Sequence, residues 1–219
     1  MKYYKYMKRE FVQRFLKGES IRIGTLHDFR NSEYYGNEVG DQREGVREIF
    51  VNDPVISSDI KESIPPIVKS FLPGFENSKR GMFFECSFIS QENSEDIYIL
   101  SLATRFDIKT MLDLGYDCCV EITNLDKFVL NITKKLMLKD LSTGRTHRGA
   151  CIYGERRTNS WDEEKIPPWS LKERTHEYQR EYRIAWEPTK QILEPINISC
   201  TSVRKYLEIK YPRYIGSEF

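Results

Sequence analysis

An acidic residue lies within a strand-like stretch near the C-terminal end of the chain. In Tyr178–Trp186, alternation by two places Glu181 on the face opposite Ile184 and Trp186. β-Branched and aromatic residues favour a strand here, and we expect it to end at Pro188 because proline has no donor for the sheet. Glu181 then points toward a cleft or toward water. A carboxylate in a cleft can stabilise a developing positive charge, whereas a solvated Glu-Arg pair is common on strand surfaces.

A polar loop flanked by arginines is the second candidate for chemistry. Residues 31–45 show no clear periodicity, and loops of this length usually bind something or are disordered. Arg30 and Arg43 suit a pyrophosphate, because a guanidinium offers a fork of donors that does not deprotonate near neutral pH. Pairing with nearby acids such as Asp41 or Glu44 is their alternative role.

Two further stretches carry polar groups that a ligand could use. Ser87 lies in the apolar stretch Gly81–Ile89, where its hydroxyl could meet a ligand or bond to backbone. Residues 143–149, Thr-Gly-Arg-Thr-His-Arg-Gly, are typical of an exposed basic turn. That turn would suit a phosphate-rich partner or would simply be solvated.

Metal, disulfide and nucleotide-loop chemistry find little support in the sequence. The five cysteines form no C-x-x-C pair, and the three histidines, His27, His147 and His176, are far apart. We therefore expect no metal site, no disulfide framework and a reducing cytoplasmic environment. Neither G-x-G-x-x-G, nor a Walker loop, nor G-x-S-x-G occurs.

The net charge of +1 neither favours nor excludes nucleic acid as a partner, since 34 basic residues nearly balance 33 acidic ones. No apolar run approaches the roughly 18 residues that would span a bilayer, so we expect no membrane partner. With 219 residues the chain fits one domain, 1–219, with an insertion at about 52–80 that is punctuated by proline and serine.

The elements that must position these groups are many strands and few short helices. Strands are expected at Tyr3–Tyr6, Ser20–Leu26, Arg47–Val51, Gly81–Ile89 (central) and Tyr116–Ile122, a helix or strand at Asp96–Thr104, and helices at Glu10–Lys17, Leu125–Leu130 and Ser170–His176. This mixture predicts an α+β fold with a mixed or antiparallel sheet.

Several of these pieces, taken in order, resemble known proteins. They are Tyr4-Lys5-Tyr6, Phe15-Leu16-Lys17-Gly18, Ile21 to Leu26, Phe29-Arg30, the strand Phe83 to Phe88, and Glu181-Tyr182-Arg183-Ile184. They resemble a bacterial family of unknown function whose members open with Tyr-Arg-Tyr and close on an acidic strand ending Glu-Tyr-Arg. The layout is also similar to ADP-ribosyltransferase toxins of the DarT type, which open Tyr-His-Ile and place a catalytic glutamate on a late strand.

The resemblance implies a split β-sheet core of the ADP-ribosyltransferase type with short flanking helices. Glu181 would be the catalytic glutamate, and Arg30 or Arg43 the arginine that contacts NAD. Tyr4, Lys5 and Tyr6 would form the nucleotide-binding strand, although Lys5 replaces the histidine of DarT-like proteins, so the contact to the adenosine ribose differs or is lost. Tyr6 or Tyr35 would stack on nicotinamide or adenine, and Ser87 would face the cofactor.

By the same resemblance the protein is an NAD-dependent ADP-ribosyltransferase. It would be a toxin or anti-phage defence effector that modifies a base of RNA or DNA and is silenced by an antitoxin protein. The residues leave a second interpretation open, in which a non-catalytic module holds nucleic acid or a protein through the same cleft or through the basic turn 143–149.

Overall fold

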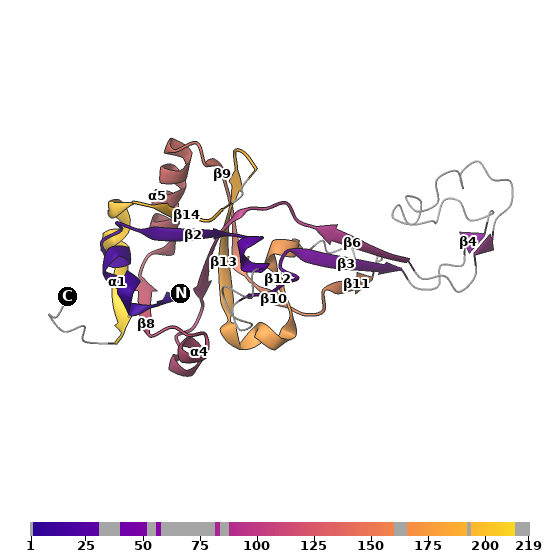
Figure 1. The fold of residues 1–219 in the computed structure, drawn as a ribbon, viewed down its shortest axis with the longest axis horizontal. Coiled ribbons are helices and arrows are strands. Elements are labelled where there is room, and N and C mark those ends of the chain that lie inside the picture. The colour runs from indigo at the N-terminus through magenta and orange to yellow at the C-terminus, as the bar shows by residue number, and fades with distance from the viewer. Residues whose placement is uncertain are drawn as a thin grey trace.

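The computed structural model describes residues 2–30, 40–51, 56–57, 82–83, 88–159, 166–191 and 194–212. An antiparallel sheet of eight strands dominates it (Figure 1). The strand order is β14-β2-β7-β1-β8-β15, and β13 pairs on the other side of β7 and with β9. The strands are β1 (Tyr3–Met7), β2 (Ile21–Thr25), β7 (Tyr98–Ala103), β8 (Cys118–Ile122), β9 (Ser142–Ala150), β13 (Glu181–Pro188), β14 (Ile196–Ile198) and β15 (Leu207–Tyr211).

One face of this sheet carries the main core. Helices α1 (Arg9–Leu16) and α5 (Leu125–Leu138) and the 3-10 helix η6 (Thr201–Tyr206) bury apolar side chains against it. In α1, Val12 and Phe15 are one helical turn apart and are both buried. Gly18 ends this helix with a φ of 67°. The sheet's side of this core consists of alternate residues of the strands, such as Ile184 and Trp186 of β13.

The opposite face is only partly covered. Helix α4 (Ile108–Asp113) begins at Asp107, whose side chain accepts from the Thr110 backbone N–H. Met111 of α4 packs with Tyr4 and Tyr6 of β1. The 3-10 helices η1 (Asp28–Arg30), η4 (Pro168–Ser170) and η5 (Arg174–Gln179) lie in the connecting segments.

Smaller sheets complete the molecule. β3 (Val46–Val51) pairs with β6 (Phe88–Asn93) and with β11 (Arg157–Asn159), and these strands project away from the eight-stranded sheet (Figure 1). β10 (Ile152–Tyr153) pairs with β12 (Leu171–Lys172), and β4 (Ile56–Ser57) pairs with β5 (Met82–Phe83). The chain is therefore α+β, as its sequence predicts. Most of the expected insertion at about 52–80 lies outside the described residues.

The structure corrects the expected limits of the Glu181 strand. β13 begins at Glu181 rather than at Tyr178, because residues 174–179 form η5 and Arg180 then takes a left-handed φ of 46°. The strand ends at Pro188, as expected, and its register with β9 shifts there. Proline is tolerated at this irregular end, where the regular ladder is already interrupted.

Two other expectations are also wrong. Residues 143–149 lie within β9 and do not form an exposed turn. The stretch Gly81–Ile89 is not the central strand, because its described residues belong to β5 and β6, outside the large sheet. The central strand is β7, within Asp96–Thr104.

Helix α5 is longer than the expected Leu125–Leu130, and the Asn124 side chain caps its start by accepting from the Lys127 N–H at 3.0 Å.

Candidate active site

The large sheet divides along one edge of its central strand. β7 pairs with β2 at Ile99, through Gly24, and with β1 only at Ala103, through Tyr4. Between these two points, no strand of the described chain pairs with that side of β7. Because β1 and β2 diverge here, the Ser101 carbonyl accepts its hydrogen bond from a side chain. Lys5 Nζ donates to this carbonyl at 3.0 Å.

A pocket of about 90 Å³ opens beside this divergence. Strand β1 contributes consecutive residues to its wall, and β7 contributes Ser101, Leu102 and Ala103. Glu181 of β13 faces it, because Glu181 pairs directly with Ala103 of β7. The lining is Tyr4, Lys5, Tyr6, Phe29, Ser101, Leu102, Ala103, Leu114, Tyr116, Lys172, Gln179, Glu181 and Arg183. Groups that are far apart in sequence thus meet at one point of the sheet.

Backbone contacts fix the start of β13, and with it the direction of Glu181. Its backbone N–H donates to the Tyr153 hydroxyl at 2.6 Å, and its carbonyl accepts from the Cys151 N–H at 2.9 Å. The preceding Arg180 carbonyl accepts from the Thr104 N–H at 2.9 Å. These bonds hold the carboxylate at the pocket wall rather than in solvent.

Both oxygens of the Glu181 side chain are bound by cations. Oε2 accepts from Lys172 Nζ at 2.7 Å, and Oε1 accepts from Arg183 Nε at 2.8 Å. Burial alone would raise the pKa of this carboxyl, but Arg183 and Lys172 outweigh it and hold the pKa well below its ordinary value of 4.5. Glu181 is therefore ionised throughout the physiological range.

Arg183 connects Glu181 to a second buried acid. Its Nη1 and Nη2 donate to the two carboxylate oxygens of Glu44 at 2.7 and 2.9 Å. Nη1 also donates to the Trp169 carbonyl at 2.5 Å. Arg183 and Glu44 are each only 1% exposed, so this bidentate pair is an internal part of the fold.

Lys172 is held by groups from η5 as well as by Glu181. Its ammonium donates to Gln179 Oε1 at 2.7 Å. The other end of the Gln179 amide lies 3.2 Å from His176 Nδ1. Burial, with Lys172 nearby, lowers the pKa of His176, so the imidazole tends to be neutral. Gln179 therefore has its carbonyl turned toward the cation and its amide toward the imidazole.

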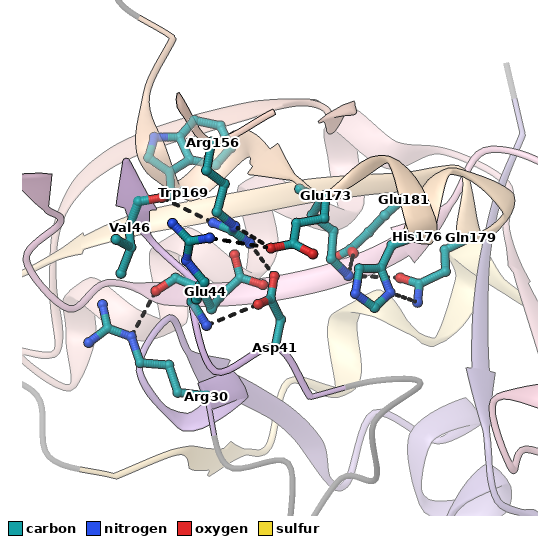
Figure 2. A network of polar contacts seen from close by, with 12 residues as sticks. Arg30, Asp41, Glu44, Val46, Arg156, Trp169, Glu173, His176, Gln179 and Glu181 are labelled. Carbon is teal, nitrogen blue, oxygen red and sulfur yellow. Dashed lines mark hydrogen bonds and ion pairs between the residues drawn. The ribbon is translucent and has the colours of Figure 1, made fainter. Parts of the chain in front are cut away.

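A second group of ion pairs supports the first from the loop that precedes β3 (Figure 2). Asp41 pairs with the buried Arg156, whose Nη1 also donates to the Val46 carbonyl at 3.2 Å. Glu173 lies 3.7 Å from Arg156 Nε. The Glu44 N–H donates to the Asp41 carbonyl at 2.8 Å. The same loop therefore pairs with Arg156 through Asp41 and with Arg183 through Glu44.

The structure brings the opening strand to the predicted glutamate. Tyr4, Lys5 and Tyr6 line the same pocket as Glu181. The Tyr6 hydroxyl is already engaged, since it donates to the Arg105 carbonyl at 2.9 Å and accepts from the Asp107 N–H at 3.0 Å. Burial raises its pKa to about 12. Tyr6 therefore offers the pocket a ring rather than a free hydroxyl.

The two arginines expected at a pyrophosphate do not line this pocket. Arg30 Nε donates to the Glu44 carbonyl at 2.7 Å, and its buried Nη2 has no hydrogen-bond partner in the described part of the chain (Figure 2). Arg43 Nη2 pairs with Glu48 Oε1 at 2.8 Å. Neither contact is the expected alternative of pairing with Asp41 or Glu44, because Arg30 binds a backbone carbonyl and Arg43 pairs with Glu48 of β3 instead. Tyr35 and Ser87 lie outside the described residues.

Several lining residues, chiefly Lys172, Gln179 and Arg183, were not predicted from the sequence. For Arg183 a signal was present, because it shares a strand face with Glu181, but the pair is buried rather than solvated. For Lys172 there was none, because it comes from the short strand β12, and nothing in its spacing to Glu181 predicts contact. Glu44 was visible only as an alternative partner for the nearby arginines.

The cations of residues 143–149 face acidic partners on neighbouring elements. His147 Nε2 lies 2.9 Å from Glu187 Oε1, and Arg145 lies 3.7 Å from the other oxygen. Arg148 pairs with Asp126 of α5. This strand therefore has no large excess of positive charge for a phosphate-rich partner.

Within the described residues, no cluster of three or more histidine, cysteine or acidic side chains could hold a metal ion. No helix among those residues has the length and apolar character needed to cross a membrane. Comparisons with protein-family models, curated proteins and solved structures found no match to this chain. No relative therefore assigns roles to the residues of the pocket.

Proposed function

We propose that the protein is an NAD-dependent ADP-ribosyltransferase with Glu181 as its catalytic residue. One observation carries the proposal: the opening strand, with Tyr4 and Tyr6, and the late-strand Glu181 line one pocket where the sheet divides. Such a meeting of the first strand with a late acidic strand is what the resemblance to DarT-type toxins implies. By the same resemblance, we place the acceptor among nucleic-acid bases and expect an antitoxin protein as partner.

The residues fit one end of NAD. A pocket of about 90 Å³ admits a single small group, so most of a dinucleotide would lie outside it. Its wall offers aromatic rings, a carboxylate and ammonium groups, which suit a nicotinamide or ribose more than a bulky apolar ligand. Neither Arg30 nor Arg43 is among the described residues that line the pocket, and each has a contact elsewhere, with the Glu44 carbonyl and with Glu48 respectively.

Cleavage of the bond between nicotinamide and ribose builds positive charge on the sugar. An ionised Glu181 would oppose that charge and would stabilise the transition state more than the ground state. Each carboxylate oxygen can accept two hydrogen bonds, so the bonds from Lys172 and Arg183 leave acceptor capacity for a ribose hydroxyl. These cations would orient the carboxylate, although they also reduce its net negative field.

Because Lys172 and Arg183 reduce the negative field of Glu181, a second candidate function is also favoured, namely a non-catalytic binding module that uses the same pocket. A carboxylate whose two oxygens are both paired is an ordinary element of a buried ion network. In this interpretation Glu181 only holds Lys172 and Arg183 in place, and the pocket recognises a group of a nucleic acid or protein. The basic stretch 143–149 supports this less, since its cations face Glu187 and Asp126.

Incubation of the full chain with NAD labelled in its adenylate moiety would distinguish the two functions. Cell extract, RNA and DNA oligonucleotides serve as acceptors, and both label transfer and nicotinamide release are measured. We expect Glu181→Gln to reduce turnover by roughly a hundredfold to a thousandfold, the usual effect of removing one preorganised electrostatic group. Glu208→Gln, on the exposed surface of β15, is the matched control.

The two variants are compared only if both melt cooperatively, because Glu181 is also part of the buried network. Turnover at the parent rate in folded Glu181→Gln would exclude this residue from catalysis. Absence of both label transfer and nicotinamide release with the parent protein, across all acceptors, would favour the binding module.

A further inference from the structure

Lys5 brings a positive charge into the pocket wall without a carboxylate of its own. The residue is half-buried, and the only hydrogen bond of its side chain in the described part of the chain is the one to the Ser101 carbonyl. A carbonyl accepts a proton but carries no net charge. Lys5 is one of the residues that line the pocket, and its ammonium has two further N–H groups.

Counting charges around the pocket leaves Lys5 unmatched. Glu44, Arg183, Glu181 and Lys172 form a chain of alternating sign in which each cation contacts an acid. Two acids and two bases make that chain neutral. Lys5 adds one positive charge to the wall that this chain does not balance.

A cation that is partly removed from water and has no contacting counter-ion is unfavourable. The pKa of Lys5 shows this effect. Burial lowers the pKa of Lys5 to about 8, Glu181 opposes the shift, and Arg22 adds to it. Arg22 is itself paired with Asp28 at 3.1 Å. An anion in the pocket would relieve this imbalance.

The pocket also has the size and the donors for a compact anion. Lys5 uses one of its three N–H groups for Ser101, and Lys172 uses two of its three for Gln179 and Glu181. Among the described residues, three ammonium N–H groups thus have no acceptor, and both lysines line a cavity of about 90 Å³. Donors on two strands, β1 and β12, suit the tetrahedral oxygens of a phosphate better than a planar carboxylate, which presents its two oxygens in one plane.

We propose that this pocket binds a phosphate group through Lys5 and Lys172. The group is either free phosphate or the phosphate of a nucleotide, because the same donors recognise both. The inference goes beyond the proposed function and does not depend on it. Because the cavity admits a single small group, a bound phosphate and the nicotinamide or ribose of NAD would exclude one another from it.

Protonation of Lys5 is the feature that links binding to pH. The ionisable groups that line the pocket beside it are those of Tyr4, Tyr6, Tyr116, Lys172, Glu181 and Arg183, and Arg22 also influences it. Burial raises the pKa of each of the three tyrosines, so they stay neutral near pH 8. Because phosphate favours the charged amine, binding should weaken as the pH rises above about 8, the pKa of Lys5 in the free protein.

The first test uses the unaltered protein. NMR of the lysine ε-methylene carbons reports the pKa of Lys5, whose resonance is assigned by its absence in Lys5→Met. We expect inorganic phosphate to raise that pKa above its value in the free protein. A pKa that is the same with and without saturating phosphate would overturn the proposal.

The second test compares ligands and variants by calorimetric titration of the full chain. Inorganic phosphate and AMP should both bind if the phosphate group alone is recognised, while AMP alone should bind if a nucleotide is required. Lys5→Met should weaken this binding by about tenfold or more, equivalent to about 1.4 kcal/mol. Lys134→Met, on the exposed surface of α5, should not change it. Binding of adenosine as tight as that of AMP, preference for acetate over phosphate, or equal affinity in folded Lys5→Met would each contradict the proposal.

Discussion

The Glu181 carboxylate lies between two cations in an interior position, and that position decides what any substitution there does. With a side chain 9% exposed and bonds to Lys172 and Arg183, it is part of the folded core as well as of the pocket. Glu181→Gln is therefore not equivalent to a surface substitution, whose effect on stability is usually within about 0.5 kcal/mol. Loss of function in this variant and loss of stability have to be measured separately.

We predict that Glu181→Gln destabilises the protein by roughly 3 to 5 kcal/mol at neutral pH, because the buried Lys172 loses its carboxylate partner and Arg183 keeps only Glu44. The difference should be greatest above the ordinary carboxyl pKa of 4.5. The folded pKa lies below that value, so the contribution of Glu181 to stability is lost as the pH falls toward the folded pKa. Urea unfolding of the parent and the variant, as a function of pH, measures this gap.

Glu208→Gln provides the control for this stability measurement, because it makes the same chemical change at an exposed strand position. It should alter stability by no more than about 0.5 kcal/mol at any pH. A gap between parent and Glu181→Gln that stays small at pH 7 would mean that the ion pairs to Lys172 and Arg183 contribute little net free energy.

At the scale of elements, the helices and strands with strong local sequence patterns were predicted well, whereas the boundaries that depend on the folded structure were not. The helix α1 and the strands β1, β2 and β8 follow from apolar spacing alone, because their periodicity is strong and glycine ends α1. The start of β13 did not follow. Tyr178 continues the alternation in sequence but belongs to η5, and only the left-handed turn at Arg180 separates the two elements.

Two glycines with similar backbone angles should respond differently to alanine. Gly18 and Gly115 have φ values of 67° and 76°, so alanine at either position should lose about 1 to 2 kcal/mol to the left-handed conformation. A Cβ at Gly115 meets no atom within 4 Å, whereas one at Gly18 would collide with the backbone carbonyl of Cys200. The Gly18 carbonyl accepts from the Cys200 N–H at 2.7 Å, so this backbone cannot move apart without losing that bond.

We therefore expect Gly18→Ala to be more destabilising than Gly115→Ala by at least about 1 kcal/mol, the loss associated with one hydrogen bond. Urea unfolding of both variants under the same conditions measures the difference. Equal free energies of unfolding would indicate that the segment around Cys200 adjusts without loss. That outcome would contradict the close approach of the Gly18 backbone to the Cys200 carbonyl.

At the scale of the molecule, the site depends on an arrangement that the sequence does not show. The α+β class follows from the mixture of elements, but the division of the sheet follows from β1 and β2 both pairing with one side of β7. Lys172 contacts Glu181, Glu44 is joined to it through Arg183, and Lys5 lines the same pocket only because separate segments return to that division. No spacing within the chain encodes those contacts, so the glutamate was predictable and its partners were not.

The last prediction concerns the strands that project from the large sheet. Val51 of β3 lies opposite Phe88 of β6, so the intervening residues 52–87 leave and return at neighbouring positions. The described residues that line the pocket come from β1, β7, β12, β13 and the segments next to them, and not from β4 or β5. Replacing residues 52–87 by Asn-Gly, which favours a two-residue hairpin turn, should preserve the fold. We expect one cooperative thermal transition, with a midpoint shifted by less than about 4 °C, the change expected from 1 kcal/mol in a chain of this size.

A variant in which residues 52–87 are replaced by a Gly-Ser linker of equal length is the matched control, because it removes the sequence but keeps the chain length. A flexible loop of that length loses only modest entropy on closure, so it should melt close to the shortened variant. β3 stays held by other contacts in both, including the Glu48 N–H to the Arg156 carbonyl at 2.8 Å and the ion pair of Arg47 with Glu92 at 2.6 Å. If both variants lose the cooperative transition, residues 52–87 contribute to the core and are not an insertion. If both variants melt like the parent and keep their affinity for phosphate, the pocket does not depend on residues 52–87. Its groups would then be held by the large sheet and by the loop at Asp41 and Glu44.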